Sequence, residues 1–259
     1  MNAQEIAERH TILRAVVGST AHGLNLPGQD DRDEMGVCIE PPEYVIGLKR
    51  FEQWVHRTQL EGTRSGPGDL DVTVYSLRKW ARLALNGNPT VLLLLFVPDY
   101  VETGYTGGLG ERLLMLAPAF VSKRAGRAFL GYLTAQKERL TGDRGQKRTR
   151  REDLVCRWGY DTKYACHAFR LGCQGVELLE TGRITLPMPE PWRGAALAIR
   201  QGKPLLPVVT AAISSFEERL TKLLETSPLP DEPDYDRVNR FLVEAYQDYW
   251  VKSKEALCG

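Results

Sequence analysis

Three carboxylates lie close together in a short stretch near the N-terminus. The stretch reads VVGSTAHGLNLPGQDDRDEMGV over residues 16–37 and contains Asp30, Asp31 and Asp33. Like charges at this spacing repel one another unless a cation lies between them. Asp31 and Asp33 have the two-residue period of a strand, which places both carboxylates on one face. Oxygen ligands of this kind suit Mg²⁺ or Mn²⁺, so the stretch predicts a divalent metal site.

A third carboxylate is expected from a later strand, GDLDVTVYS, over residues 68–76. Asp69 and Asp71 share one face of this strand, while Leu70, Val72 and Val74 occupy the other. The strand period alone leaves either aspartate as the third ligand.

A Gly-Ser pair precedes the aspartates, where the apolar run TILRAVV ends. A tight turn at Gly18 and Ser19 exposes backbone N–H groups that can hold phosphate oxygens, and the serine hydroxyl adds a donor. Each motif is common by itself, and DDRD alone is typical of a solvated turn. In this order, however, a Gly-Ser turn and three strand carboxylates predict a two-metal phosphoryl-transfer site.

The elements that position these residues divide the chain into two parts. Residues 1–117 have a mixed α/β pattern, with a helix near 2–10, strands at 11–17, 34–40 and 69–76, and a helix from 77 that stops at 86–89. From Pro118 onward strand patterns disappear, and helices are expected within 119–140, 151–182 and 236–257. We therefore expect a domain over residues 1–117 and a helical domain over residues 118–259.

Composition favours a folded globular protein, because 42% of the 259 residues are hydrophobic and 26% are charged. No apolar run approaches the roughly 20 residues of a membrane span, and the N-terminus lacks the pattern of a secretory signal. We therefore expect a cytoplasmic protein without a membrane partner. The five cysteines are odd in number and form no CxxC pair, which predicts neither a disulfide framework nor a zinc site.

Residues 121–151 form a strongly basic segment within a chain of net charge +1. They include ten Lys and Arg residues but only Glu138 and Asp143 as acids, a local net charge of +8. Such a segment is either a solvated helix face and loop or a binding site for a polyanion such as nucleic acid. The nucleic-acid interpretation assigns phosphate contacts to Lys147, Arg148, Arg150 and Arg151.

With these motifs in order, the chain resembles the DNA polymerase β nucleotidyltransferase superfamily. More narrowly, GSTAHGL, DDRDEMGV, YSLRKWARLALNGNPTVLLLLF and GYDTKYACHAFRLGCQGVELLETG are similar to the RNA-repair-associated, RlaP-type nucleotidyltransferases, a family that includes phage members. The resemblance extends over most of residues 12–185. It implies an α/β fold with a mixed-sheet, polymerase β-like core, followed by a mostly helical C-terminal domain that contributes to the nucleotide and acceptor cleft.

The resemblance also implies roles for the residues of the two motifs. It makes Asp31, Asp33 and Asp71 the catalytic metal ligands, with Asp69 as the alternative to Asp71. It assigns Gly18 and Ser19 to the terminal phosphates of the nucleotide. The sequence departs from the family's motif at one position. Asp30 stands where family members have serine, and the loop before it is one residue longer.

A second group of residues has helical spacing in the C-terminal half. Lys163, His167 and Arg170 are spaced i, i+4 and i+7, which places them on one helix face. The resemblance assigns this face to nucleotide binding. The alternative is that these side chains pair within the protein, for example with Asp161 or Glu177.

The resemblance implies transfer of a nucleoside monophosphate from an NTP, expected to be ATP, to an acceptor hydroxyl, with release of pyrophosphate. Two Mg²⁺ or Mn²⁺ ions would assist. The family and the basic segment favour an RNA 3′-end, or another nucleic-acid 3′-end, as the acceptor. Nucleotidylation of a protein or small molecule is the alternative. A non-catalytic nucleotide- or nucleic-acid-binding protein is a second one, which the complete carboxylate set argues against. The oligomeric state stays open.

Overall fold

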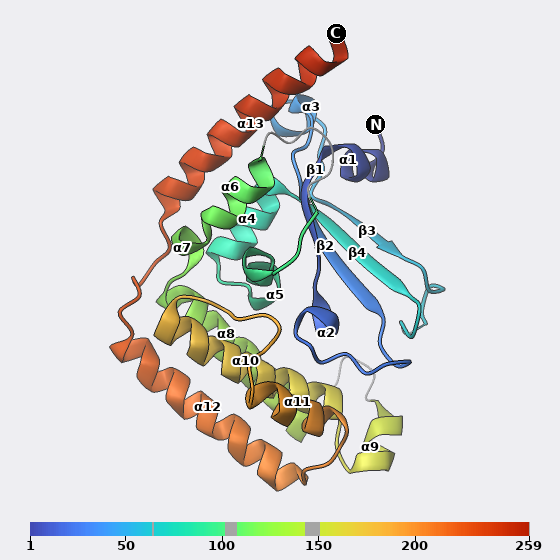
Figure 1. Ribbon diagram of the computed structural model, residues 1–259, viewed down its shortest axis with the longest axis vertical. Helices are drawn as coiled ribbons and strands as arrows, with labels where there is room; N and C mark the ends of the chain where they lie inside the picture. Colours follow the sequence, from blue (N-terminus) through green and yellow to red (C-terminus); the bar gives the residue numbers. More distant parts are fainter. Residues whose placement is uncertain (64, 102–107, 143–150, 259) are drawn as a thin grey trace. The chain divides into compact units, whose positions relative to one another are not determined.

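The computed structural model describes residues 1–63, 65–101, 108–142 and 151–258, with side chains as far as residue 252 (Figure 1). The chain forms two compact units. Unit 1 comprises Met1–Leu85, Thr90–Phe120 and Asp234–Gly259, and unit 2 comprises Asn86–Pro89 and Val121–Pro233. No helix within the described ranges combines the length and the apolar character that a membrane span requires.

Unit 1 is built around a mixed four-stranded sheet, which confirms the expected α/β class. The strands are β1 (Thr11–Val16), β2 (Arg32–Cys38), β3 (Gln53–Arg57) and β4 (Leu70–Ser76), in the order β1-β2-β4-β3. β2 pairs in parallel with β4, while β1 and β3 pair antiparallel with their neighbours. Sequence analysis missed β3, because this largely exposed edge strand has no apolar alternation.

The central strand β4 carries its valines and its aspartate on opposite faces. On one face of β4, Val72 and Val74 are almost fully buried and pack in a cluster with Ile6 of α1 (Ala3–His10). The alternate residues of β4 face the other way, and in the β2–β4 register Asp33 lies beside Asp71. The valines of β4 therefore anchor the sheet at one face, while Asp33 and Asp71 lie at the other.

Helices and short turns complete unit 1. They are α2 (Gly18–Ala21), α3 (Pro42–Val45), α4 (Leu77–Leu85), α5 (Pro89–Leu92), the 3-10 helix η1 (Leu93–Phe96), α6 (Leu109–Met115), α7 (Ala117–Phe120) and α13 (Tyr235–Cys258). α4 buries Leu77, Trp80, Ala81 and Ala84, the face that its spacing predicts.

The C-terminal helix α13 differs from the expected domain division. Sequence analysis grouped residues 118–259 together, whereas α13 packs against α4 and α7 and belongs to unit 1. The hydroxyl of Tyr246 donates to Glu40 at 2.8 Å, and the indole N–H of Trp250 donates to the Glu40 backbone carbonyl at 3.0 Å. A helix pattern identifies an amphipathic face but not the element that covers it.

Unit 2 is helical throughout its described residues, as predicted. It contains α8 (Lys123–Thr141), α9 (Glu152–Trp158), α10 (Thr162–Thr181), α11 (Trp192–Arg200) and α12 (Leu206–Thr226). α10 is the central helix and packs against α8, α11 and α12. Gly172 and Gly175 permit this close packing, because a Cβ on Gly172 would lie 2.7 Å from Phe216 and one on Gly175 would lie 2.9 Å from Phe129.

The helical pattern over residues 151–182 is two helices. Gly159 ends α9 in the left-handed region at φ 80°. Asp161 then caps α10 by accepting backbone hydrogen bonds from Lys163 at 3.0 Å and Tyr164 at 3.1 Å.

Candidate metal and nucleotide site

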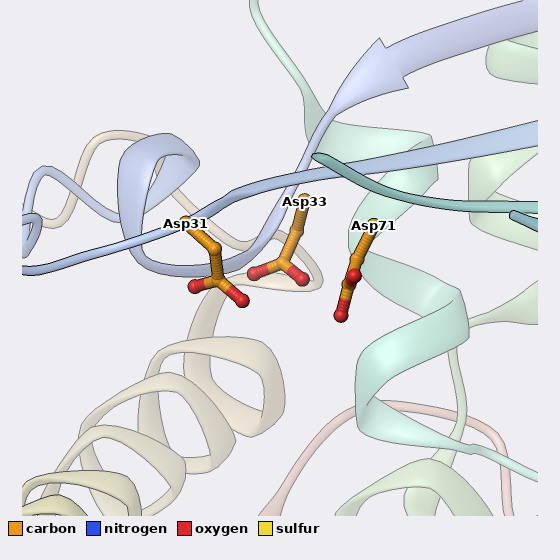
Figure 2. A group of neighbouring side chains, drawn as sticks. All are labelled: Asp31, Asp33 and Asp71. Atoms are coloured by element: carbon orange, nitrogen blue, oxygen red, sulfur yellow. The ribbon is translucent and has the colours of Figure 1, made fainter. Parts of the chain in front are cut away.

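Three aspartates converge at one face of the sheet in unit 1. Asp33 on β2 and Asp71 on β4 are paired in the parallel register, and Asp31 lies directly before β2. One carboxylate oxygen from each of the three lies within 4.8 Å of the others. Figure 2 shows all three carboxylates on the same side of the strands. The two-residue spacing thus brings Asp31 and Asp33 together, and strand pairing adds Asp71.

The structure distinguishes the two candidates for the third carboxylate. Asp69 lies outside the group of three, and its carboxylate forms hydrogen bonds within the segment between β3 and β4. It accepts hydrogen bonds from the hydroxyl of Thr58 at 3.0 Å and from the backbone N–H of Gly66 at 2.9 Å. Asp71 is the one that lies beside Asp33.

Asp30 has a local contact that sets it apart from the other two aspartates of its stretch. Its Oδ2 accepts a hydrogen bond from the backbone N–H of Leu26 at 2.7 Å. This contact lies within the loop between α2 and β2, and Asp33 pairs with Asp71 in the register of β2 with β4.

Gly18 brings the Gly-Ser turn directly against Asp33. Its φ of 64° lies in the left-handed region, which favours glycine. A Cβ at this position would overlap Oδ2 of Asp33 and would lie 2.7 Å from its Cγ. The backbone N–H of Val17 also donates to the carbonyl of Asp33 at 2.9 Å. The turn with Gly18 and Ser19 and the aspartate pair are therefore parts of one local structure.

The donor set fits a hard divalent cation. All three side chains offer carboxylate oxygens, which Mg²⁺ and Mn²⁺ prefer. Oδ1 of Asp71 is buried and has no hydrogen-bond partner among the described residues. A buried oxygen without a partner costs roughly 1–3 kcal/mol, which a bound cation would offset.

Sequence analysis did not identify the residues that contact Asp71. The hydroxyl of Ser65 donates to Oδ2 of Asp71 at 3.1 Å, and the side-chain amide of Gln59 donates to Ser65 at 2.6 Å. Nε of Arg57, on β3, lies 3.7 Å from the same Oδ2. These polar residues lie six to fourteen positions from Asp71 in a segment without periodicity. Only the pairing of β3 with β4 brings them to the site.

The predicted cationic face of α10 has a mixed character. Lys163 is exposed, and its side chain has no hydrogen bond or ion pair within the described part of the chain. Arg170 donates to Oε1 of Gln174 at 2.9 Å. Burial, followed by the neighbouring positive charges of Arg170, Arg139 and Arg151, lowers the pKa of His167 to about 3. His167 is therefore uncharged at neutral pH.

The basic segment is partly neutralised by acidic residues of unit 2. Five of its described residues form ion pairs. Lys123 pairs with Asp231, Arg124 and Arg127 pair with Glu232, and Lys137 pairs with Glu217. Arg151 pairs with the buried Asp161 at 3.2 Å and lies over the ring of Tyr164. Lys147, Arg148 and Arg150, the other predicted phosphate contacts, lie outside the described residues. The local charge of +8 is therefore reduced by residues distant in sequence.

Comparison with known proteins supplies the family. No curated protein matches this chain. Among solved structures, a nucleotidyltransferase-like protein from Exiguobacterium sibiricum aligns over 86% of this chain and 71% of its own, with 14% identity and a TM-score of 0.31. The family model described as "RlaP: RNA repair pathway DNA polymerase beta family" matches residues 1–244. The chain therefore belongs to the RlaP family of the DNA polymerase β type and is a nucleotidyltransferase.

Proposed function

We propose that this protein transfers a nucleoside monophosphate from an NTP, with ATP as the expected donor, to the 3′-hydroxyl of an RNA. The observation that carries the proposal is the group of Asp31, Asp33 and Asp71 beside the Gly18 turn, in a chain of the RlaP family. Oxygen of the acceptor hydroxyl forms a bond to the α-phosphorus. The bond from that phosphorus to the bridging oxygen breaks, and pyrophosphate leaves.

The three aspartates would hold two Mg²⁺ or Mn²⁺ ions. Bound divalent metal supplies charge stabilisation to the attacking and departing oxygens. Asp71 would hold the metal on the acceptor side and take part in removing the proton of the hydroxyl. Asp31 and Asp33 would hold both metals. Ser19 would donate to the departing phosphates, and Gly18 leaves room for the turn to lie against Asp33.

Nucleotide binding is further assigned to Lys163, His167 and Arg170 by their match to the family's motif. Lys163 is exposed and without a side-chain partner within the described ranges, as a phosphate-binding lysine must be before its ligand arrives. The lowered pKa of His167 gives it the role of a neutral hydrogen-bonding group at neutral pH. Arg170 and Lys163 then supply the positive charge.

The description of the family as part of an RNA repair pathway supports an RNA acceptor and, with it, a cytoplasmic location. Transfer to a protein or small molecule is the alternative. A binding protein without chemistry is disfavoured, because loss of catalysis releases the selection on crowded carboxylates, which repel one another when no cation is bound.

The direct test is a labelling assay. The protein is incubated with each α-labelled NTP and with Mg²⁺ or Mn²⁺, and RNA, DNA and protein acceptors are then separated. We expect label on RNA with ATP, and none with Asp33→Ala. Glu34→Gln is the matched control, because Glu34 is the adjacent acid on β2 and faces the other side, where Arg14 and Arg32 hold it. Label on protein alone would replace the RNA acceptor by the alternative.

The basic segment tests the acceptor independently. Replacing Lys147, Arg148 and Arg150 by glutamine should weaken RNA binding; Arg151 is kept in this variant because it pairs with the buried Asp161. Each lost phosphate contact should also reduce the log–log salt slope by about 0.7. The pair Arg124→Gln and Arg127→Gln is the control, because both arginines are engaged with Glu232. An unchanged slope in this triple variant would mean that the segment is a solvated surface.

A further inference from the structure

The carboxylate of Asp71 is contacted on one oxygen only. Ser65 donates to Oδ2 at 3.1 Å, and Nε of Arg57 lies 3.7 Å from that same oxygen. Oδ1 is buried and has no hydrogen-bond partner among the described residues. The two oxygens of one side chain are therefore in different environments, which fixes the rotation of the carboxylate.

Gln59 determines the direction in which Ser65 donates. The side-chain amide of Gln59 donates to the Ser65 oxygen at 2.6 Å, so this oxygen acts as the acceptor in that contact. A serine hydroxyl has one hydrogen to donate, and here it goes to Oδ2 of Asp71. Gln59 and Ser65 thus form a short chain of hydrogen bonds that ends on Oδ2 of Asp71 and leaves Oδ1 free of this chain.

Rotation of the carboxylate matters because the terminal torsion of aspartate is broad. Without a fixed partner, an aspartate side chain samples a wide range of this torsion. A metal ligand has to present one oxygen in a narrow direction, and partners behind the ligand commonly supply that restriction. In this chain the β3–β4 segment supplies them, since Gln59 and Ser65 both lie between those strands.

We propose that Ser65 and Gln59 are positioning residues that hold Asp71 through Oδ2 so that Oδ1 is presented to a divalent cation. The proposal rests on the proposed function, in which Asp71 is a metal ligand. Arg57 has the opposite effect on affinity. Its side chain is 63% exposed and its positive charge lies beside Oδ2, where it neutralises Asp71 and opposes the approach of a cation.

Mn²⁺ binding to the full-length protein without nucleotide tests the proposal, with free Mn²⁺ followed by electron paramagnetic resonance. Ser65→Ala should weaken binding by about 10- to 100-fold, the usual effect of losing a partner behind a metal ligand. Ser65→Thr retains the hydroxyl and should bind close to wild type. Gln59→Leu should weaken binding less than Ser65→Ala, and Arg57→Gln should tighten it. Circular dichroism of each variant establishes that it is folded.

Thr63→Ala is the matched control, because this hydroxyl lies in the same segment but donates to the Leu60 carbonyl. Its Mn²⁺ affinity should equal that of wild type. Equal affinity in Ser65→Ala and wild type would overturn the positioning role while leaving the proposed function intact. A third outcome is that wild type binds Mn²⁺ and Ser65→Ala binds it more weakly, while no nucleoside monophosphate is transferred from any NTP to any acceptor. In that case the proposed function fails and the positioning role stands. Absence of Mn²⁺ binding in wild type overturns both.

Discussion

The carboxylate group of unit 1 and the α10 face of unit 2 differ in how far their charged groups have partners within the protein. In unit 1, one carboxylate oxygen from each of three aspartates lies within 4.8 Å of the others. Among the described residues, Nε of the largely exposed Arg57 lies 3.7 Å from Oδ2 of Asp71. At α10, by contrast, several charges are satisfied within unit 2, although the side chain of Lys163 has no partner among the described residues. Arg151 pairs with Asp161, Arg170 bonds to Gln174, and burial keeps His167 uncharged.

The difference distinguishes charges that stabilise the protein from charges that are available to bind a ligand. An ion pair such as Arg151 with Asp161 contributes to the stability of its own unit and needs no ligand. Crowded carboxylates cost free energy in the unliganded protein, and a cation reverses that cost. By this criterion the aspartates carry the strongest indication of ligand binding, and Lys163 is the residue of α10 that resembles them.

The largest effect is expected at the carboxylates. Asp33→Ala or Asp31→Ala should abolish nucleotidyl transfer without unfolding the protein, because removing one acid relieves repulsion. In the absence of metal the melting temperature should be unchanged or higher, and the stabilisation that wild type gains from Mn²⁺ should disappear. Labelled-NTP transfer and thermal unfolding with and without Mn²⁺ measure both.

Glu34→Gln is the control for that experiment and should give the reverse result. Hydrogen bonds from Arg14 and Arg32, both on the opposite face, hold Glu34. Its loss should cost about 1 kcal/mol of unfolding free energy, since these pairs are partly exposed, and should leave transfer intact. Wild-type turnover in Asp33→Ala would contradict the metal assignment.

The next effect is expected at Gly18. Gly18→Ala should destabilise the protein by roughly 1–2 kcal/mol through its left-handed φ. It should also impair Mn²⁺ binding, because the new Cβ displaces the carboxylate of Asp33. Gly28→Ala is an unusually close control: φ is 71° and a Cβ meets nothing within 4 Å. It should show the stability loss alone, and equal Mn²⁺ affinities in both variants would rule out the displacement.

A smaller effect is expected on α10. Lys163→Glu should weaken nucleotide binding more than tenfold, beyond what an exposed surface pair contributes. Lys222→Glu makes the same charge change at an exposed position of α12 and should leave nucleotide affinity unchanged. Isothermal titration with ATP and Mg²⁺ measures both variants. Equal affinities would assign the α10 face entirely to unit 2's own structure and would sharpen the contrast with the carboxylates.

The effect that is smallest at neutral pH concerns the protonation of His167. Burial is the main cause that lowers the pKa of His167 from 6.5 to about 3, so between these values the unfolded chain binds a proton that the folded chain does not. Stability should therefore fall as pH decreases from 6.5 toward 3, by at most about 1.4 kcal/mol per pH unit from this residue. Urea unfolding of wild type and His167→Gln across this range measures it. Parallel pH curves for the two proteins would contradict the buried, neutral histidine.

Much of the group formed by Asp31, Asp33 and Asp71 could be predicted without a structure, because it depends on local rules. A two-residue period places Asp31 and Asp33 on one face, and an apolar alternation in β4 directs Asp71 away from the core. A glycine before serine at the end of β1 predicts the turn. Such rules involve neighbours in the chain, which is why the α/β pattern, the helical half and the buried face of α4 could be predicted as well.

Tertiary structure decided everything that depends on distant partners. Parallel pairing of β2 with β4 brings Asp71 beside Asp33, and loop hydrogen bonds engage Asp69 and Asp30. The edge strand β3 and the partners Ser65 and Gln59 carry no periodic signal. Four of the ion pairs that neutralise part of the basic segment join residues 80 to 108 positions apart, and a fifth joins Arg151 to Asp161. Sequence period determines the face on which a side chain lies, but folding determines which groups meet it there, because those contacts come from other segments of the chain.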